Sequence, residues 1–491
     1  MDGIERKGGS EASDRYPSRL ECRGPRNKPM DLSIVILAAG KGTRMRSGIA
    51  KVLQPIAGRP LLQHVLETGS QLQANRLVVV YGHAGEQVQA AMRGFQSQAT
   101  LLWVKQEPQS GTGHAVLCAL PVLPPTGKTL ILYGDVPFIT TQTLQLLLEK
   151  SGCGLSMLTM TLQNPSGYGR IYRDHGRVLG IVEEKDADAH QKLITEVNTG
   201  ILCVDNALLH AEIPCLNNDN AQKEYYLTDL IARVVARGIV VDTVAPQALW
   251  EVEGVNDKVQ LAALERDWQK AQAKRLMLQG LTIADPLRFD LRGQLTHGSD
   301  CYVDINVIFE GQVTLGNHVH IEANCVLKDC VIGDHSRVRA MSSIDSARIE
   351  DHCLLGPFAR IRPDTHLESG VHVGNFVEVK KSILGRGSKA NHLTYLGDAI
   401  VGEAVNIGAG TITCNYDGFN KHTTQIDAGV FIGSNNSLVA PVHIHAGATT
   451  GAGSVISKDV PENTLAVGRS RQQHIEQWQR PQDRQNKPSD H

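Results

Sequence analysis

The sequence has few aromatic side chains, no excess of positive charge and no long apolar run. Phe, Trp and Tyr make up only 4% of the 491 residues, whereas glycine occurs 47 times. Few rings and many glycines favour small regular coils over a core packed with aromatic side chains. Because the formal net charge is −2, no basic surface for nucleic acid is expected. No apolar run reaches the roughly 18 residues of a membrane-spanning helix, so no membrane partner is expected.

Paired cysteines are also missing. The ten cysteines are scattered, with no C-x-x-C pair and no clustering with histidine. The two closest, Cys325 and Cys330, are interpreted as small buried hydrophobic residues. Residues 1–29 lack the apolar core of a secretory signal. These absences exclude a disulfide framework and a zinc ribbon, and they predict a reducing, cytoplasmic location.

The length of the chain requires more than one hydrophobic core. Residues 1–29 are rich in Gly, Ser, Pro and mixed charge without periodicity, which predicts a disordered extension, and Met30 is an alternative start. The polar C-terminal residues predict a mobile tail. We divide the chain into a first domain at 30–256, a linker helix at 257–280, a second domain at 281–470 and a tail at 471–491.

Strands and helices alternate in the first domain. Residues 85–92 are predicted to be helical, and apolar runs predict buried strands at 33–37, 77–81, 129–133, 154–162, 200–204 and 239–244. This alternation favours a Rossmann-like α/β fold with a doubly wound, mainly parallel sheet. Ligands bind such sheets beyond the carboxyl ends of the strands, where Gly40 and Asp135 lie.

The first strand ends in the glycine-rich turn LAAGKGTRM at 37–45, and Lys51 follows. Small residues let the backbone turn tightly and approach a ligand closely. A helical pattern follows, so free N–H groups and a positive helix end are expected to face an anion. Arg44 and Lys51 add the positive charge that a polyphosphate requires. An ordinary strand–helix turn with exposed basic residues is the alternative on spacing alone.

Asp135 follows the strand at 129–133. Mg²⁺ is typically held by one or two protein oxygens, with substrate phosphates and water completing its shell. Asp135 is therefore a candidate magnesium ligand at the same sheet edge as the glycine-rich turn. A turn-capping aspartate is the alternative interpretation.

Residues 257–278 carry apolar side chains at helical spacing, separated by charges. This pattern predicts a connecting helix with a structural role. Its packed face is expected to carry Leu261, Leu264, Trp268, Ala271 and Leu278.

Beyond this helix the aliphatic period changes to six residues. Six-residue periodicity with small residues at the corners is typical of a hexapeptide β-helix, so the second domain is predicted to be an all-β, left-handed parallel β-helix. Stacked coils would bury the aliphatic column. The repeating positions are Val303, Phe309, Leu315, Ile321 and Leu327; Ile349, Leu355, Ile361, Leu367, Val373 and Val379; and Val401, Ile407 and Thr413.

Two segments, at 388–398 and 414–422, are expected to interrupt the coils, and loops on rigid scaffolds often carry function. His392 lies in the first of them, near Tyr395 and downstream of Glu378, which makes it a candidate general base. A structural or merely exposed histidine is the alternative. Three further basic residues could equally be solvated charges at the coil edge: Arg362, Lys380 and Arg469.

Motifs along the first domain resemble those of sugar-phosphate nucleotidyltransferases. They are LAAGKGTRM with Lys51, Gln106 with 111–114, 133–135, 167–170, Glu183, 196–200 and 253–256. The second domain adds NHLTYLGD at 391–398 and GAGTITCNYDG at 408–418. From Met30 to Arg469 the chain thus resembles the bacterial family of bifunctional N-acetylglucosamine-1-phosphate uridyltransferase/glucosamine-1-phosphate N-acetyltransferases.

The resemblance implies that the first domain joins UTP and N-acetylglucosamine 1-phosphate into UDP-N-acetylglucosamine and releases pyrophosphate. Mg²⁺ would be held by Asp135 and Asn256, and phosphates would be neutralised by Arg44 and Lys51. The residues implied at this site are Leu37, Ala38, Ala39, Gly40, Arg44, Lys51, Gln106, Gly111, Thr112, Tyr133, Gly134, Asp135, Gly169, Glu183, Asn198 and Asn256. Of these, Gly169, Glu183 and Asn198 would contact the sugar and its N-acetyl group.

For the second domain the resemblance implies acetyl transfer from acetyl-CoA to the amine of glucosamine 1-phosphate, with His392 as the base. Glu378 is a candidate for the group that orients His392. The sugar phosphate would contact Arg362, Lys380, Tyr395 and Asn406. Acetyl-CoA would contact Ala409, Asn415, Tyr416, Ser434, Ala452 and Arg469. The resemblance also implies a homotrimer that supplies peptidoglycan and lipopolysaccharide synthesis.

Two positions depart from the family pattern. Ala50 replaces a proline expected before Lys51, and Asn391 replaces a glycine expected before His392. Asn tolerates a positive φ if that position requires one. Two other functions remain open: a uridyltransferase whose β-helix has lost acetyl transfer, and a non-catalytic regulatory or scaffold subunit. A scaffold subunit would be expected to have lost Lys51, Asp135 or Asn256, and all three are present.

Overall fold

The computed structural model of the chain describes residues 31–82, 84–152 and 154–481. The disorder predicted for 1–29 lies outside these residues, and the predicted tail is described only to residue 481, up to which its residues are exposed. The chain forms two compact units. The first holds the described residues up to Gln54 together with Pro60–Leu261, and the second holds Pro55–Arg59 and the residues from Ala262 onward.

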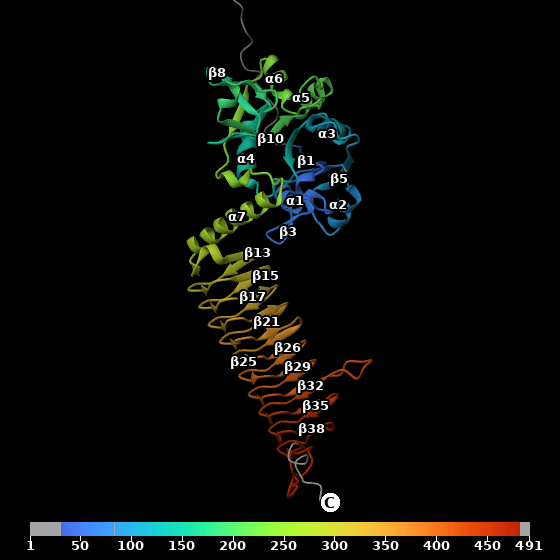
Figure 1. The fold of residues 1–491 in the computed structure, drawn as a ribbon, viewed down its shortest axis with the longest axis vertical. Coiled ribbons are helices and arrows are strands. Elements are labelled where there is room, and N and C mark those ends of the chain that lie inside the picture. Colours follow the sequence, from blue (N-terminus) through green and yellow to red (C-terminus); the bar gives the residue numbers. More distant parts are fainter. Residues whose placement is uncertain (1–30, 83, 153, 482–491) are drawn as a thin grey trace, which may run out of the picture. The chain divides into compact units, whose positions relative to one another are not determined.

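A nine-stranded sheet forms the first unit (Figure 1). Its strands are β1 (Leu32–Ala38), β4 (Arg76–Tyr81), β5 (Thr100–Lys105), β6 (Lys128–Tyr133), β7 (Leu155–Thr161), β8 (Arg170–Asp174), β9 (Arg177–Val182), β10 (Glu196–Asp205) and β11 (Val241–Val244). The main strand order is β11-β7-β10-β6-β1-β4-β5, and all neighbours on this path are parallel except β10 with β6 and β7. The predicted mainly parallel α/β sheet is confirmed.

Helices cover both faces of this sheet, as a doubly wound fold requires. One apolar layer packs α1 (Leu61–Gln71), α2 (Gly85–Ala91) and α4 (Thr141–Lys150) against the sheet. The opposite layer packs α3 (Thr112–Ala119), α5 (Asn206–Glu212) and α6 (Asp229–Ala236). Among the helices of the described residues, none combines the length and the apolar character needed to cross a bilayer.

The helix predicted directly after the glycine-rich turn is not formed. After β1 the chain makes only the short 3-10 helices η1 (Thr43–Met45) and η2 (Lys51–Leu53), and α1 begins at Leu61. Gly42 has φ 59°, and a Cβ at this glycine would lie 2.6 Å from the Cβ of Lys51. Position 42 therefore requires glycine, because a larger residue would collide with Lys51. Attraction of an anion therefore depends on backbone N–H groups and basic side chains here, rather than on an α-helix dipole.

Helix α7 (Lys258–Leu278) confirms the predicted connecting helix, but its packed face differs from the prediction. Leu278 is 80% exposed, whereas Gln269 is only 1% exposed. The Gln269 amide donates to the Leu291 carbonyl at 2.9 Å and accepts from the Leu291 N–H at 2.8 Å. Because both hydrogen bonds are made, this polar side chain can be buried. The buried residues of α7 are Leu264, Gln269, Ala273 and Leu276.

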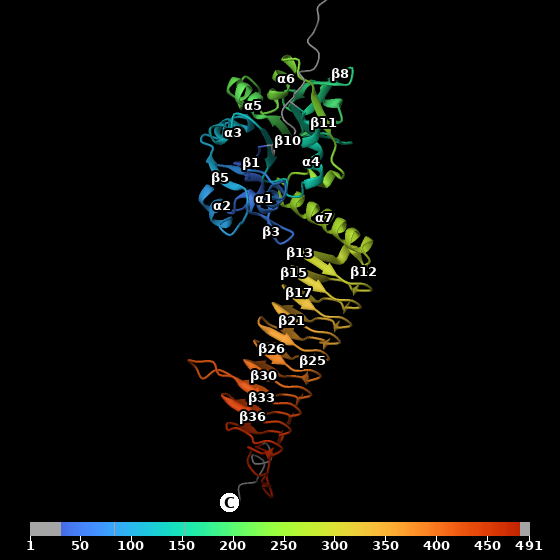
Figure 2. The ribbon, with the colours of Figure 1, turned by 180° about the vertical axis from the view of Figure 1, so that it is seen from behind.

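The second unit is a parallel β-helix, as predicted (Figures 1 and 2). One face is an eleven-stranded sheet of β12 (Thr282–Ile283), β14 (Tyr302–Val303), β16 (His320–Ile321), β19 (Arg337–Val338), β22 (Leu354–Leu355), β25 (His372–Asn375), β28 (Lys389–His392), β31 (Asn406–Ile407), β34 (Phe431–Ile432), β37 (Thr449–Thr450) and β39 (Leu465–Ala466). The long strands β13 (Phe289–His297) and β15 (Val307–Leu315) pair in parallel and begin the other two ladders.

One of those ladders continues through β17 (Val326–Lys328), β20 (Ser343–Asp345), β23 (Arg360–Ile361), β26 (Glu378–Lys380), β29 (Tyr395–Gly397), β32 (Ile412–Cys414), β35 (Ser437–Val439) and β38 (Val455–Ile456). The other continues through β18 (Val331–Ile332), β21 (Ala347–Ile349), β24 (Thr365–Leu367), β27 (Ile383–Leu384), β30 (Ala399–Val401), β33 (Thr424–Ile426) and β36 (Val442–Ile444). Every residue of the predicted hexad runs is at most 4% exposed, so these residues form the inner column.

The interruption predicted at 388–398 is wrong. These residues form β28 and β29, in register with the preceding coil, with Val373 opposite Ala390 and Val379 opposite Leu396. Ala390 and Leu396 are fully buried and continue the inner column. A small alanine at an inner position conceals the hexad from a pattern based on larger aliphatic residues.

The interruption predicted at 414–422 is confirmed. Between β32 and β33 the chain leaves the coil as a projecting loop, visible in Figures 1 and 2. Within this loop the Asp417 Oδ2 and His422 Nε2 atoms lie 2.8 Å apart, and Tyr416 forms an isolated antiparallel bridge with Lys421. The loop therefore has its own internal bonds on a rigid scaffold.

Candidate active sites

A cavity of about 430 Å³ lies at the carboxyl ends of the strands of the first unit. The turn after β1 and the residues that follow β5 and β6 contribute to its wall. Parallel strands that end at one edge bring these segments together. The predicted residues that line it are Leu37, Ala38, Ala39, Gly40, Lys51, Gln106, Gly111, Thr112, Tyr133 and Asp135.

The N-terminus of α3 reaches this cavity. Gly111 precedes the helix with φ 104°, and a Cβ there would lie 2.6 Å from the Tyr225 carbonyl oxygen. The buried Gln106 donates from Nε2 to the Gly111 carbonyl at 2.9 Å. The glycine and this hydrogen bond together fix the start of α3 at the cavity wall.

Lys51, Asp135 and Asn256 meet at one point. The Lys51 ammonium forms an ion pair with Asp135 Oδ2 and donates to Asn256 Oδ1 at 3.1 Å. The side chains of Lys51 and Asp135 are only 13% and 18% exposed. The Val255 N–H donates to the Asp135 carbonyl at 2.9 Å, which holds the segment of Asn256 beside the end of β6. Two oxygen donors thus converge on a single cation.

A second cavity of about 290 Å³ shares Tyr133 and Asp135 with the first. Arg44 and Asn256, both predicted site residues, also line it. Asp135 therefore lies between two adjacent spaces. This arrangement can place the Asp135 carboxylate, with Lys51 and Arg44 nearby, between phosphates bound in the two cavities.

Gly169, Glu183 and Asn198 do not line either cavity, but the structure brings them together. The Asn198 N–H donates to the Gly169 carbonyl at 2.9 Å, and a Cβ at Gly169 would lie 3.4 Å from Glu183 Oε2. The strand register of β10 shifts just after Asn198, and Gly200 in this bulge lies against the Tyr133 ring. Tyr133 thus connects this group to both cavities. Gly134 also lies outside both linings, and its N–H donates to the Leu37 carbonyl at 3.0 Å.

Burial changes the acidity of two groups at this site. Burial raises the pKa of Tyr133, and the charges of Glu183 and Asp135 add to the effect. Burial also raises the pKa of Glu183, against the hydrogen bond that Thr228 donates to its carboxylate at 2.9 Å. Tyr133 therefore stays neutral near pH 7 and can act there as a hydrogen-bond donor.

Glu183→Gln is expected to remove a pH-dependent loss of stability. Because the pKa of Glu183 is raised above its usual 4.5 in the folded chain, the native state holds this proton more tightly than the unfolded chain does. Its contribution to the free energy of unfolding therefore falls as pH rises through the raised pKa. Urea unfolding of the full chain should show wild type losing stability relative to Glu183→Gln as the pH rises above 4.5. An identical pH dependence in both proteins would contradict this account.

Sequence reasoning missed several cavity residues. Gln109 donates from Nε2 to the Ala39 carbonyl at 2.6 Å and so supports the glycine-rich turn. The sequence offered one indication that Gln109 belongs to this cavity: it lies three residues after Gln106, a predicted site residue. The other missed lining residues are Val52, Ala115 and Glu224 in the first cavity, and Val136, Ser166, Val252 and Gln260 in the second. Five more lining residues lie in the predicted motifs but had no assigned role: Lys41, Gly167, Tyr168, Thr199 and Gly254.

Ala50 causes no distortion before Lys51. Its φ of −52° lies within the range of proline, so alanine holds the backbone that a proline would. Its N–H donates to Gln87 Oε1 at 3.1 Å, a hydrogen bond that proline cannot make.

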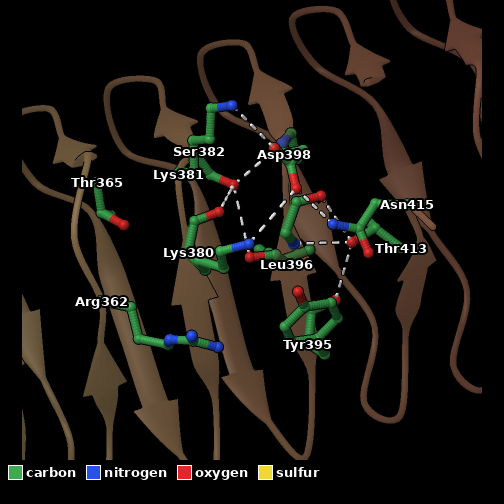
Figure 3. Close-up of polar contacts among 12 residues, drawn as sticks. Arg362, Thr365, Lys380, Lys381, Ser382, Tyr395, Leu396, Asp398, Thr413 and Asn415 are labelled. Carbon is green, nitrogen blue, oxygen red and sulfur yellow. Dashed lines mark hydrogen bonds and ion pairs between the residues drawn. The ribbon is translucent and has the colours of Figure 1, made fainter. Parts of the chain in front are cut away.

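A second polar cluster lies on the β-helix (Figure 3). Arg362, Lys380 and Tyr395 come from three successive coils of the ladder that contains β23, β26 and β29. The Lys380 ammonium lowers the pKa of the adjacent Lys421, which comes from the projecting loop. Cations brought this close to one another can bind a doubly charged phosphate. Lys421 was not predicted from the sequence.

Asp398 connects this cluster to the projecting loop. Its side chain is 7% exposed and lies 4.0 Å from Lys380 Nζ and 3.5 Å from Lys381 Nζ. Asn415 donates from Nδ2 to Asp398 Oδ2 at 2.5 Å, as Figure 3 shows. One buried carboxylate thus positions Lys380 and Asn415, which the sequence assigned to two different substrates.

His392 lies at the end of β28, opposite Asn375, and it is exposed. Glu378 contacts Arg362 at 2.7 Å and Arg360 at 3.4 Å, and no hydrogen bond joins it to His392 in the described residues. Glu378 therefore orients Arg362 rather than the histidine. Asn391 has no positive φ; Leu393, at 48°, is the left-handed residue near it.

Four of the predicted acetyl-CoA residues lie along one corner of the β-helix. Ala409, Ser434 and Ala452 each come two residues after a strand of the eleven-stranded sheet, in consecutive coils. Arg469 donates to the Ala452 carbonyl at 2.6 Å. Asn406 occupies the same sheet, opposite Lys389. Tyr416 is 60% exposed in the projecting loop.

The doubly wound unit with its strand-end cavity and the hexapeptide β-helix define a nucleotidyltransferase of two-domain architecture. The family model of the MobA-like NTP transferase domain matches residues 34–178. Three curated relatives are called Bifunctional protein GlmU. They come from Acinetobacter baylyi (56% identity, 92% of this chain and 99% of the relative), Acinetobacter baumannii strain AYE (55%, 92% and 99%) and Alkalilimnicola ehrlichii (53%, 92% and 96%).

The chain belongs to the family of Bifunctional protein GlmU. It is a bifunctional enzyme with uridyltransferase and acetyltransferase activities. Nothing in these comparisons supports a regulatory or scaffold subunit.

Proposed function

We propose that each unit holds one of the two activities. The first domain, at 30–256, transfers uridylyl from UTP to N-acetylglucosamine 1-phosphate, and the β-helix, at 281–470, first acetylates glucosamine 1-phosphate. The observation that carries the first assignment is the convergence of Asp135 and Asn256 on Lys51 between two cavities. The second assignment rests on the basic cluster of Lys380 and Lys421, with Asp398 beside Lys380.

In uridylyl transfer, a phosphate oxygen of the sugar phosphate attacks the α-phosphorus of UTP and pyrophosphate leaves. Catalysis of such a step is mainly positioning and neutralisation of charge. Lys51 and Arg44 neutralise phosphate oxygens on either side of Asp135. The buried Gln106 and the start of α3, at Gly111 and Thr112, hold the uridine in the larger cavity.

The donor set at Asp135 and Asn256 fits Mg²⁺. Both side chains offer hard oxygen atoms, and both already contact one cation, the Lys51 ammonium. When bound, Mg²⁺ would neutralise charge on the nucleotide phosphates. We expect Lys51 to give up its place between the two oxygens and to bind a phosphate instead.

In acetyl transfer, the amine of glucosamine 1-phosphate attacks the thioester carbon, and the CoA thiolate leaves. The amine attacks only when it is unprotonated, so His392 accepts its proton. Arg362, Lys380 and Lys421 bind the sugar phosphate, and Tyr395 and Asn406 lie beside it. The corner that carries Ala409, Ser434 and Ala452 holds the acetyl donor, with Asn415, Tyr416 and Arg469.

We further propose that the enzyme is a homotrimer formed through the β-helix and that it works in the cytoplasm. The cysteines of the described residues are free, which is typical of proteins in a reducing compartment. Its product, UDP-N-acetylglucosamine, is a precursor for peptidoglycan and lipopolysaccharide.

The two half-reactions can be tested separately on the purified full chain. UTP with N-acetylglucosamine 1-phosphate should release pyrophosphate, and acetyl-CoA with glucosamine 1-phosphate should release a free thiol. When Mg²⁺ is left out and a chelator is added, pyrophosphate release should stop and thiol release should continue. A wild-type protein that failed either reaction would contradict the proposal, and loss of both on chelation would contradict the assignment of Mg²⁺ to the first unit.

A further inference from the structure

A histidine-rich cluster lies on the β-helix outside the site described above. It consists of Asp427, directly after β33, and His443 and His445, in and directly after β36. Among the described residues, these three form the one group of His, Cys, Asp or Glu side chains whose ligand atoms all lie within 4.8 Å of one another. Asp427 Oδ2 lies 2.9 Å from His443 Nε2 and 3.6 Å from His445 Nδ1.

We propose that Asp427, His443 and His445 form a binding site for a first-row divalent ion, with Zn²⁺ as the ion to test. Imidazole nitrogens and a carboxylate are the ligands that Zn²⁺ takes in proteins. In a tetrahedral zinc site, ligand atoms lie about 3.4 Å apart. The two distances to Asp427 Oδ2 lie on either side of this value.

The backbone holds the three side chains in place. Strands β33 and β36 pair in parallel, with Ile426 opposite Ile444. The Asp427 N–H donates to the Ile444 carbonyl at 2.8 Å, and the His445 N–H donates to the Val460 carbonyl at 3.0 Å. A prearranged ligand set lowers the ordering cost of binding.

The side chains are accessible but not loose. The exposed fractions of the Asp427, His443 and His445 side chains are 31%, 29% and 41%. The two imidazole rings have centroids 3.8 Å apart, and a nitrogen of each lies near the same oxygen, Asp427 Oδ2. Three protein ligands on one side leave the remaining coordination positions for water or a further ligand.

The chain contains a matched control for this geometry. In an earlier coil of the same ladder, Glu350 follows β21 as Asp427 follows β33, and His366 lies in β24 where His443 lies in β36. His366 Nε2 lies 2.9 Å from Glu350 Oε1, the same distance as in the His443–Asp427 pair. The position of His445 is taken by Glu368, which accepts a hydrogen bond from the Arg386 N–H at 3.0 Å. The matched positions Glu350, His366 and Glu368 offer a single imidazole and should not bind Zn²⁺.

Calorimetric titration of the full chain with Zn²⁺, in an excess of Mg²⁺ that fills sites selective for hard oxygen ligands, tests the proposal. We expect wild type and His366→Gln to bind Zn²⁺ equally. We expect His443→Gln and His445→Gln each to weaken binding at least about tenfold, and acidification to weaken it because both imidazoles must be neutral. Zn²⁺ should also raise the unfolding temperature of wild type and of His366→Gln, but not of the other two.

Acetyl transfer by His443→Gln and His445→Gln serves as the control for folding, because neither residue belongs to the catalytic cluster. Three results would overturn the site. They are no Zn²⁺ binding by wild type, Zn²⁺ binding as tight as that of wild type in both His443→Gln and His445→Gln, and a loss of Zn²⁺ affinity in His366→Gln as large as in those two variants. Either variant is sufficient for the test if the other fails to fold.

Discussion

Asp135→Ala is expected to lower uridylyl transfer at least about 10³-fold and to leave acetyl transfer within about twofold of wild type. Among the described residues, Tyr133 and Asp135 are common to both cavity linings, so Asp135 supplies the carboxylate where they meet. Its removal takes away the ion pair of Lys51 and leaves the hydrogen bond from Lys51 to Asn256 Oδ1. A loss this large is typical when a group that organises charge around a transferred phosphoryl is deleted. Pyrophosphate release at saturating UTP measures the first activity, and thiol release measures the second.

Asp174→Ala is the matched control for this experiment. Asp174 also ends a strand of the first unit, but its side chain is 65% exposed and lies outside both cavity linings. We expect both activities of this variant to equal those of wild type. Retention of uridylyl transfer by Asp135→Ala would contradict the assigned site, and loss of both activities in a folded protein would contradict the separation of the two activities.

His392→Ala is expected to lower acetyl transfer about 10²- to 10⁴-fold, the range typical for loss of a general base, without affecting uridylyl transfer. The residual rate of the variant should rise with pH, because the fraction of unprotonated amine rises. The cluster of Arg362, Lys380 and Lys421 stays intact in this variant, so the Michaelis constant for glucosamine 1-phosphate should change little. The effect should be confined to the turnover number.

His175→Ala is the control for a general effect of removing a histidine. The His175 side chain is 95% exposed, and its nearest charged partner is the adjacent Asp174. Both activities should be unchanged in this variant. If His392→Ala instead raised the Michaelis constant with an unchanged turnover number, His392 would bind the substrate rather than accept its proton.

The sequence predicted the architecture well where a periodic pattern reports burial. The hexad positions from Val303 to Thr413 are the inner column, because one residue in six must fill the narrow interior of each coil. The alternation of apolar runs with helices likewise predicted the mainly parallel sheet that brings Gly40 and Asp135 to one edge. Strand direction was beyond this reasoning: β10 runs antiparallel to β6 and β7, and an apolar run carries no information about direction.

The errors arose where polar bonds or small residues replace the expected pattern. Ala390 concealed a regular coil. Gln269 is buried alongside the expected Leu264 because its amide is bonded to Leu291 and Glu265. The helix predicted after the glycine-rich turn is absent, since the chain makes short 3-10 turns before α1.

Side-chain partners were the hardest features to predict. The sequence placed Glu378 with His392, whereas the structure pairs Glu378 with Arg362. It gave no role to Asp398, which holds Lys380 and Asn415, or to Lys421. Such contacts join residues from different coils, and no local pattern along the chain reports them.

Mixing the two inactive variants tests most directly whether the chain holds two independent sites. Asp135→Ala and His392→Ala would each be supplied with glucosamine 1-phosphate, acetyl-CoA, UTP and Mg²⁺, first separately and then together. We predict that neither variant alone forms UDP-N-acetylglucosamine, and that the mixture forms it after a lag while free N-acetylglucosamine 1-phosphate accumulates. Formation of UDP-N-acetylglucosamine by either variant alone would contradict the account. So would a mixture that forms no UDP-N-acetylglucosamine although each variant retains its remaining half-reaction.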